Sequence, residues 1–185
     1  MNRKITKYTL KKASEHIYYE IWMFFVILDM LSNKRNKSTV ENNILLDAFA
    51  IHTRNLFDFF YPKSSFKKDD ILFSDYIKNI TLYKKRVIRK RELIYIVRKA
   101  DKQVAHLTYS RNRYTKHTKP WRFLEIGSIL FVAVKVFYDL LPPKYKILEN
   151  FSRLKVVLDG NNHLSNSRSY KVIKSQTPRL YKLKL

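Results

Sequence analysis

The sequence predicts an all-α protein: a bundle of four long helices and one short helix, followed by a basic C-terminal extension. Apolar residues recur three and four positions apart along most of the chain, which is the spacing of amphipathic helices. Only two of the 185 residues are glycine, and strand-rich folds usually need more glycine for their tight hairpins. Hydrophobic residues make up 45% of the chain, enough to bury a core. We expect the helical domain over residues 1–145 and the extension over 146–185.

The first two helices are predicted by apolar spacing and by a capping pattern. Residues 5–32 carry apolar side chains at helical spacing, and the polar stretch SNKRNK then interrupts the pattern. Ser38 and Glu41 have the spacing of a capping box, in which each side chain accepts a backbone hydrogen bond from the other residue. The second helix should end at Tyr61, because Pro62 disfavours the helical conformation in the residue before it.

The next two helices follow a polar loop. Asp69 or Asp70 is placed to cap a short helix that runs through Ile77. A long helix is then predicted over residues 85–109. Its inward face should carry six apolar residues, Leu93, Ile96, Val97, Ala100, Val104 and Leu107.

The last predicted helix begins at residues 118–120 and ends at Leu141. Pro120 is tolerated in a first helical turn, and the pair Pro142-Pro143 stops the helix. Beyond it the periodicity weakens, and LKVVLDG and YKVIK could be short strands. Residues 151–185 contain eight Lys or Arg and one acid, so we interpret this region as a basic extension.

The charge of the chain indicates a polyanionic ligand. There are 38 Lys or Arg against 15 acids, a formal charge of +23, and a compact domain with this excess repels itself unless it binds an anion. Biased genome composition explains frequent lysine but not scarce Asp and Glu. Residues 83–122 alone hold fourteen Lys or Arg and two acids, with tyrosines at 83, 95, 109 and 114 that could stack on bases. The cations expected to contact nucleic acid are Lys84, Lys85, Arg86, Arg89, Lys90, Arg91, Lys99, Arg113 and Lys116.

Several classes of site are excluded or not expected. The chain has no cysteine, so it has no disulfides, zinc–thiolate sites or cysteine nucleophiles. The N-terminus is too polar for a secretory signal, and the longest apolar run, residues 21–28, is far short of a membrane span. We expect a cytoplasmic protein without a membrane span, cofactor or metal.

Two histidines differ in their expected roles. His52 falls on the apolar stripe of the second helix, so we expect a buried histidine with a hydrogen-bond partner. Arg54 lies on another face, where Asp58 is four residues away and can form a salt bridge with it. His106 shares its face with basic and polar residues. Nearby cations favour its neutral form, which a general base needs.

Arginine near His106 suggests phosphate chemistry. Arg111 follows five residues later and could bind a phosphate and stabilise developing charge. Such a pair would suffice for attack by a ribose 2′-hydroxyl without a metal. His117 lies six residues after Arg111 and is the competing partner. The alternative is that His106 is an exposed histidine with no task.

The stretch ADKQVAHLTYSR at 100–111 resembles the fourth-helix segment of HEPN domains. These small helical bundles are common in prokaryotic defence and toxin–antitoxin systems. Asp101, Lys102, Ala105 and His106 stand where an RDKxxAH-type variant has its D, K, A and H, while Ala100 occupies the position of the motif arginine. Arg111-Asn112 and His117 satisfy the arginine-to-histidine spacing in a second frame. The stretches HTRNLFDFFY at 52–61 and KPWRFLEI at 119–126 are also similar to bacterial proteins of HEPN-like appearance.

The resemblance implies a HEPN-like antiparallel bundle, and a homodimer whose facing motif helices form one RNA-binding cleft. His106 would be the base and Arg111 the phosphate ligand. The supporting residues would be Arg54, His52, Lys102 and His117. Three functions stay open: a metal-independent endoribonuclease, a non-catalytic nucleic-acid-binding or antitoxin-like protein, and a peripheral membrane or structural RNA-binding protein acting through the extension. RNA is the expected ligand, DNA is not excluded, and an acidic or nucleic-acid partner could neutralise the protein.

Overall fold

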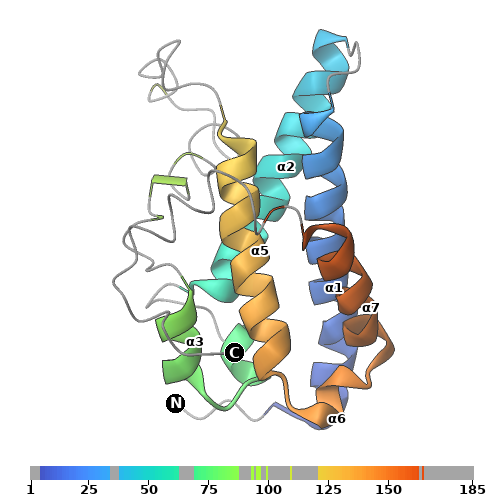
Figure 1. Cartoon of the computed structure of the whole chain (residues 1–185), viewed down its shortest axis with the longest axis vertical. Coiled ribbons are helices and arrows are strands. Elements are labelled where there is room, and N and C mark those ends of the chain that lie inside the picture. The colour runs from blue at the N-terminus through green and yellow to red at the C-terminus, as the bar shows by residue number, and fades with distance from the viewer. Residues whose placement is uncertain are drawn as a thin grey trace.

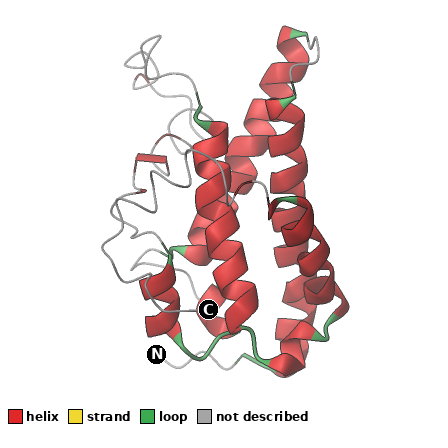
Figure 2. Ribbon diagram, in the orientation of Figure 1, coloured by secondary structure: helices red, strands yellow, loops and turns green. Residues whose placement is uncertain are grey.

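The fold is seen in a computed structural model of the chain. It describes residues 5–33, 38–62, 69–87, 93, 95, 96, 99, 109, 121–162 and 164. Within these ranges the chain is helical and contains no strand, which confirms the predicted all-α class (Figures 1 and 2). No helix of this part combines the length and apolar character needed to cross a bilayer.

Helices α1 (Lys7–Ser32) and α2 (Thr39–Phe60) form an antiparallel pair. The predicted capping box is present, with the Glu41 amide donating to Ser38 Oγ at 3.2 Å and the Ser38 amide donating to Glu41 Oε2 at 2.7 Å. Helix α2 ends at Phe60 with Tyr61 as its C-cap, as Pro62 predicts.

Helix α5 (Phe123–Leu140) packs against both α1 and α2. A methyl group at Gly127 would lie 2.5 Å from Leu28 Cδ2, so the glycine allows α5 to approach α1 closely. The helix ends at Leu140 with Leu141 as its C-cap, which is within one residue of the predicted end at Leu141. Its predicted start was too early, because Trp121 and Arg122 are not helical.

The start of α5 is displaced because aromatic packing fixes the chain before it. The rings of Trp121 and Phe123 both meet Phe49 of α2 nearly edge-on, with ring centroids 5.8 and 5.1 Å away. These edge-on ring contacts hold Trp121 and Phe123 against α2.

The region between α2 and α5 differs from the prediction. The short helix expected after Asp69 or Asp70 is wrong: a single 3₁₀ turn, η1 (Phe73–Asp75), stands there, and Asp75 Oδ2 accepts a 2.9 Å hydrogen bond from the Leu72 amide. A separate helix, α3 (Ile80–Arg86), then ends at Val87 in extended conformation.

The predicted start of a long helix at Lys85 is therefore also wrong. Lys85 and Arg86 form the last turn of α3 instead. Among the described residues of the predicted helix, Leu93 and Ile96 are buried, in agreement with their expected inward face.

The C-terminal region contributes to the core, which the sequence did not predict. After α6 (Pro143–Lys146), helix α7 (Glu149–Gly160) packs along α1. Phe151 and Leu154 of α7 are fully buried, and Asn150 Nδ2 donates to Ser14 Oγ of α1 at 3.2 Å. The core thus includes residues of the predicted basic extension, 146–185, so this prediction is wrong for α7.

Candidate nucleic-acid interface

The structure describes six of the predicted site residues. These are His52, Arg54, Lys84, Lys85, Arg86 and Lys99. The catalytic pair His106 and Arg111 lies outside the described residues, and so do Lys102 and His117. The other expected nucleic-acid contacts outside them are Arg89, Lys90, Arg91, Arg113 and Lys116.

His52 is buried between α1 and α2, as its position on the apolar stripe predicts. Its exposed fraction is 8%, and its Nδ1 lies 2.7 Å from Oε2 of Glu20 on α1. The ring of Tyr19 meets the imidazole edge-on at 5.9 Å between centroids. The contacts with Glu20 and Tyr19 fix the orientation of the imidazole. No described residue forms a hydrogen bond with its Nε2.

Arg54 also lies where it was predicted. Its Nε is 4.0 Å from Oδ2 of Asp58, one helical turn further along α2. Both side chains are about two-fifths exposed, so water screens this ion pair and it contributes little to stability. The ion pair orients the Arg54 guanidinium at the surface of α2.

Helix α3 presents a cluster of cations. Lys84 and Lys85 are exposed at its last turn, and the first turn of α3 has no acid. Arg86 is half-buried and donates from Nη2 to Asp139 Oδ2 of α5 at 3.2 Å. Asp139 therefore neutralises Arg86 in part and fixes the end of α3 against α5, while the two lysines point to solvent.

A second cationic group surrounds the start of α5. The ammonium of Lys99 lies 5.1 Å from the centroid of the Trp121 ring, a cation–π geometry. Partial burial, and then the positive charge of Arg122, lower the pKa of Lys99. An anion bound next to Lys99 would favour the charged form of its ammonium and so offset this effect.

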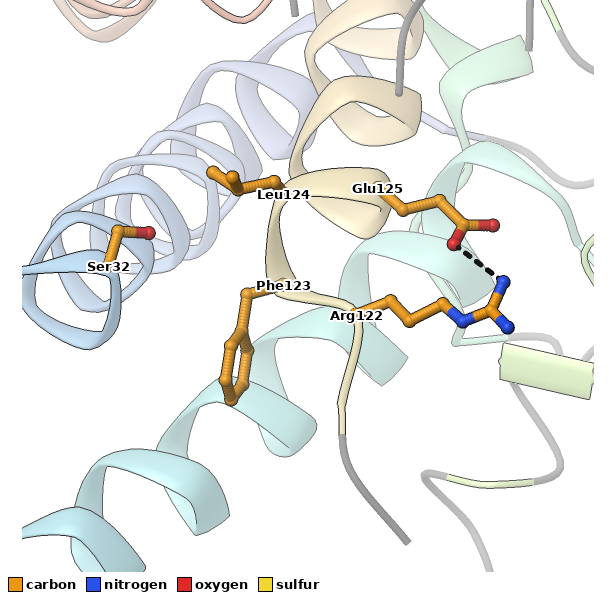
Figure 3. A pocket seen from close by; sticks show the side chains of 5 residues that line it. All are labelled: Ser32, Arg122, Phe123, Leu124 and Glu125. Atoms are coloured by element: carbon orange, nitrogen blue, oxygen red, sulfur yellow. Dashed lines mark hydrogen bonds and ion pairs between the residues drawn. The ribbon is translucent and has the colours of Figure 1, made fainter. Parts of the chain in front are cut away.

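Glu125 balances part of this charge. It accepts from Arg122 Nη1 at 3.3 Å (Figure 3). It also accepts from the Tyr95 hydroxyl at 2.5 Å. Burial, followed by the hydrogen bond to Glu125, raises the pKa of Tyr95. Tyr95 therefore stays neutral, and its ring is tied to the first turn of α5.

A shallow pocket of about 400 Å³ opens beside this group. It lies between the end of α1, at Ser32, and the first residues of α5, including Arg122 and Phe123 (Figure 3). The Arg122 guanidinium, on a side chain that is 77% exposed, reaches out from α5 next to Glu125.

The tyrosines of the basic segment differ in accessibility. Tyr83 was expected to stack on bases, but it is 1% exposed and its ring stacks on Phe73 at 4.2 Å. That expectation is wrong for Tyr83, because the core occupies both of its faces. Tyr95 and Tyr109 are 46% and 94% exposed and keep an accessible ring. Tyr114 lies outside the described residues.

Sequence reasoning missed three polar or aromatic partners. Glu20 follows Ile17 by three residues and precedes Phe24 by four, so a carboxylate on an apolar stripe was the available signal. Trp121 and Glu125 gave no such signal, because their partners Lys99 and Tyr95 are far away in the sequence. Comparison of the chain with protein-family models, characterised proteins and solved structures gives no match.

Proposed function

We propose that this chain is an RNA-binding protein with a HEPN-like helical bundle, and that its binding surface extends over α3 and the start of α5. The observation that carries the proposal is the Lys99 ammonium over the Trp121 ring, where burial and then the positive charge of Arg122 lower the pKa of Lys99. A phosphate at this position would relieve the repulsion between the cations.

The rest of the surface supports the same ligand. Lys84 and Lys85 add charge that is not opposed by acids on α3, and phosphate contacts of this kind supply most sequence-independent affinity. The exposed rings of Tyr95 and Tyr109 suit unpaired bases, which favours single-stranded RNA over a duplex.

Filter binding of a short single-stranded RNA over a salt series tests this proposal. The double variants Lys84→Gln/Lys85→Gln and Lys99→Gln/Arg122→Gln should each weaken binding. Each should also lower the slope of log affinity against log salt by about 1.4, at roughly 0.7 per lost phosphate contact.

The matched control is Lys144→Gln/Lys155→Gln, which removes the same charge from exposed positions on α6 and α7. Its slope should stay close to that of the wild type. Equal losses in all three double variants would show that only net charge matters, and would contradict a defined interface.

Cleavage of the bound RNA is a second proposed function, and it rests on the basic sequence segment that contains His106 and Arg111. His106 would remove the proton of a ribose 2′-hydroxyl, and Arg111 would bind the phosphate that this oxygen attacks. The P–O5′ bond would break as a 2′,3′-cyclic phosphate forms, and the leaving 5′-oxygen would take a proton from the protonated His106 or from water. Such chemistry in the cytoplasm would suit a defence or toxin–antitoxin role, with an acidic or nucleic-acid partner to neutralise the protein.

Incubation of the purified protein with total RNA and EDTA tests this second function. We expect cleavage by the wild type and none by His106→Ala, which should melt at the wild-type temperature. Wild-type protein that binds RNA but leaves it intact would reject cleavage and favour the non-catalytic alternative. Equal cleavage by both proteins would mean that His106 is not the base.

A further inference from the structure

Two side-chain contacts join the segment that contains Tyr95 to the start of α5. Tyr95 and Lys99 are helical residues one turn apart. The Tyr95 hydroxyl meets Glu125, and the Lys99 ammonium lies over the ring of Trp121, four positions before Glu125. The partners follow in reverse order along the two segments, so the segments lie antiparallel and hold these four side chains in one register.

Glu125 is the inner member of this group. Its Oε1 accepts from the Tyr95 hydroxyl at 2.5 Å. Its Oε2 accepts from Arg122 Nη1 at 3.3 Å (Figure 3). The Glu125 side chain is 23% exposed, whereas Tyr95 and the Arg122 side chain are 46% and 77% exposed. One carboxylate therefore holds an aromatic ring and a guanidinium side by side at the surface.

Charge alone does not explain a carboxylate on a surface proposed to bind RNA. Glu125 repels phosphate, and a neutral side chain there would make the site more positive. Its place in the first turn of α5 suits an acid, because the amino end of a helix carries partial positive charge. That preference does not account for the two hydrogen bonds, which engage both carboxylate oxygens with the side chains proposed to contact base and phosphate.

The arrangement has the scale of one nucleotide, in which a single ribose separates the base from the phosphate. A guanidinium has five N–H donors and the bond to Glu125 uses one of Arg122, so the others can bind phosphate oxygens. The Tyr95 ring is fixed at its hydroxyl end and can stack on a base. Fixing both side chains before RNA arrives reduces the entropy that binding costs.

We propose that Glu125 is a positioning residue, which holds the Tyr95 ring and the Arg122 guanidinium so that one unpaired nucleotide is bound by its base and its phosphate together. This inference rests on the proposed RNA binding and adds the source of its preference for unpaired bases. It also implies an effect opposite in sign to that of net charge. Neutralising Glu125 weakens RNA binding, although the protein becomes more positive.

Binding of two polyanions by Glu125→Gln tests the inference. One is a short oligouridylate, and the other is inorganic polyphosphate, which has phosphates but no bases. We expect Glu125→Gln to bind the oligouridylate about fivefold or more weakly than the wild type, the size of one lost stacking contact. It should bind polyphosphate as tightly as the wild type or more tightly.

Tyr95→Phe is an independent test, because it keeps the ring and removes the hydroxyl that Glu125 holds. It should show a loss of similar size with the oligouridylate and none with polyphosphate. Combining it with Glu125→Gln should add little, since both changes break the same contact. Thermal melts of the variants establish that each is folded at the assay temperature.

Glu149→Gln is the matched control. Glu149 is also an acid in the first turn of a helix, α7, and it also pairs with an arginine, Arg153. The substitution makes the same change in charge as Glu125→Gln. Its affinity for the oligouridylate should equal that of the wild type or be slightly higher.

Three results would overturn the inference. One is a Glu125→Gln variant that binds the oligouridylate as tightly as the wild type or more tightly, since net charge would then govern the site. Another is equal weakening toward both polyanions, since the base would then have no part. The third is a wild-type chain that binds no RNA, which would reject the proposed function as well, whereas the first two results leave that function intact.

Discussion

Glu20 Oε2 on α1 lies 2.7 Å from Nδ1 of His52 on α2, in the seam between two helices whose buried residues are mostly apolar. One turn away along both helices, the rings of Phe24 and Phe49 pack at 5.3 Å between centroids. The polar pair therefore replaces one apolar layer of the α1–α2 interface. A slip between the helices would separate the two partners, so we expect the pair to fix their register.

His52→Ala should lower the free energy of unfolding by about 1–3 kcal/mol, because it leaves the Glu20 carboxylate in the seam without its partner. Replacing both residues, as in Glu20→Leu/His52→Leu, should cost less than the single change, since the seam becomes uniformly apolar. Urea unfolding of the two single variants and the double variant measures the coupling. Additive losses would show that the two side chains do not stabilise each other.

Leu154→Ala should destabilise the protein by about 2–5 kcal/mol, because Leu154 is fully buried between α7 and the rest of the core. Truncation after Asn150 should remove cooperative thermal unfolding for the same reason. The exposed neighbour Lys155→Ala is the control and should change stability by less than about 0.5 kcal/mol. A truncated chain that still melts cooperatively would mean that α7 is dispensable to the core.

The case of α7 explains which parts of the fold the sequence could predict. Helices α1 and α2 carry long apolar stripes and a complete capping box, so local signals alone specify their extent. In α7 the adjacent valines of the stretch LKVVLDG suggest a strand. The apolar residues at 151, 154 and 158 have helical spacing, and α7 buries them by packing on α1. Tertiary packing therefore decides its structure.

The candidate site follows the same division. His52 and the Arg54–Asp58 pair could be predicted, because their roles depend on spacing within one helix. The sequence predicts Lys99 to be part of the cationic surface, but it does not predict the cation–π contact of Lys99 with Trp121. The two residues are 22 positions apart, and no periodicity links them.

Alkaline pH should unfold the protein beginning near pH 10. Burial raises the pKa of Tyr76, Tyr83 and Tyr95 above the value of 10.0 for an exposed tyrosine. Above pH 10 these tyrosines ionise in the unfolded chain but stay neutral in the folded one. The unfolded state is therefore favoured increasingly as the pH rises above 10. Tyrosinate absorbance and circular dichroism should change together on titration. Ionisation of all the tyrosines before any loss of helix would contradict this expectation.

Thr53→Val should leave the protein as stable as the wild type or make it more stable by up to about 1–2 kcal/mol. Thr53 is fully buried in α2, and its hydroxyl has no hydrogen-bond partner in the described structure. Valine has nearly the same shape, so it removes an unsatisfied polar group without opening a cavity. Thr53→Ala is the matched control: it removes the same hydroxyl but also a methyl group, and should be less stable than Thr53→Val by about 1 kcal/mol. Urea unfolding of both variants measures the difference, and a Thr53→Val variant that is less stable than the wild type would show that the hydroxyl is hydrogen-bonded in solution.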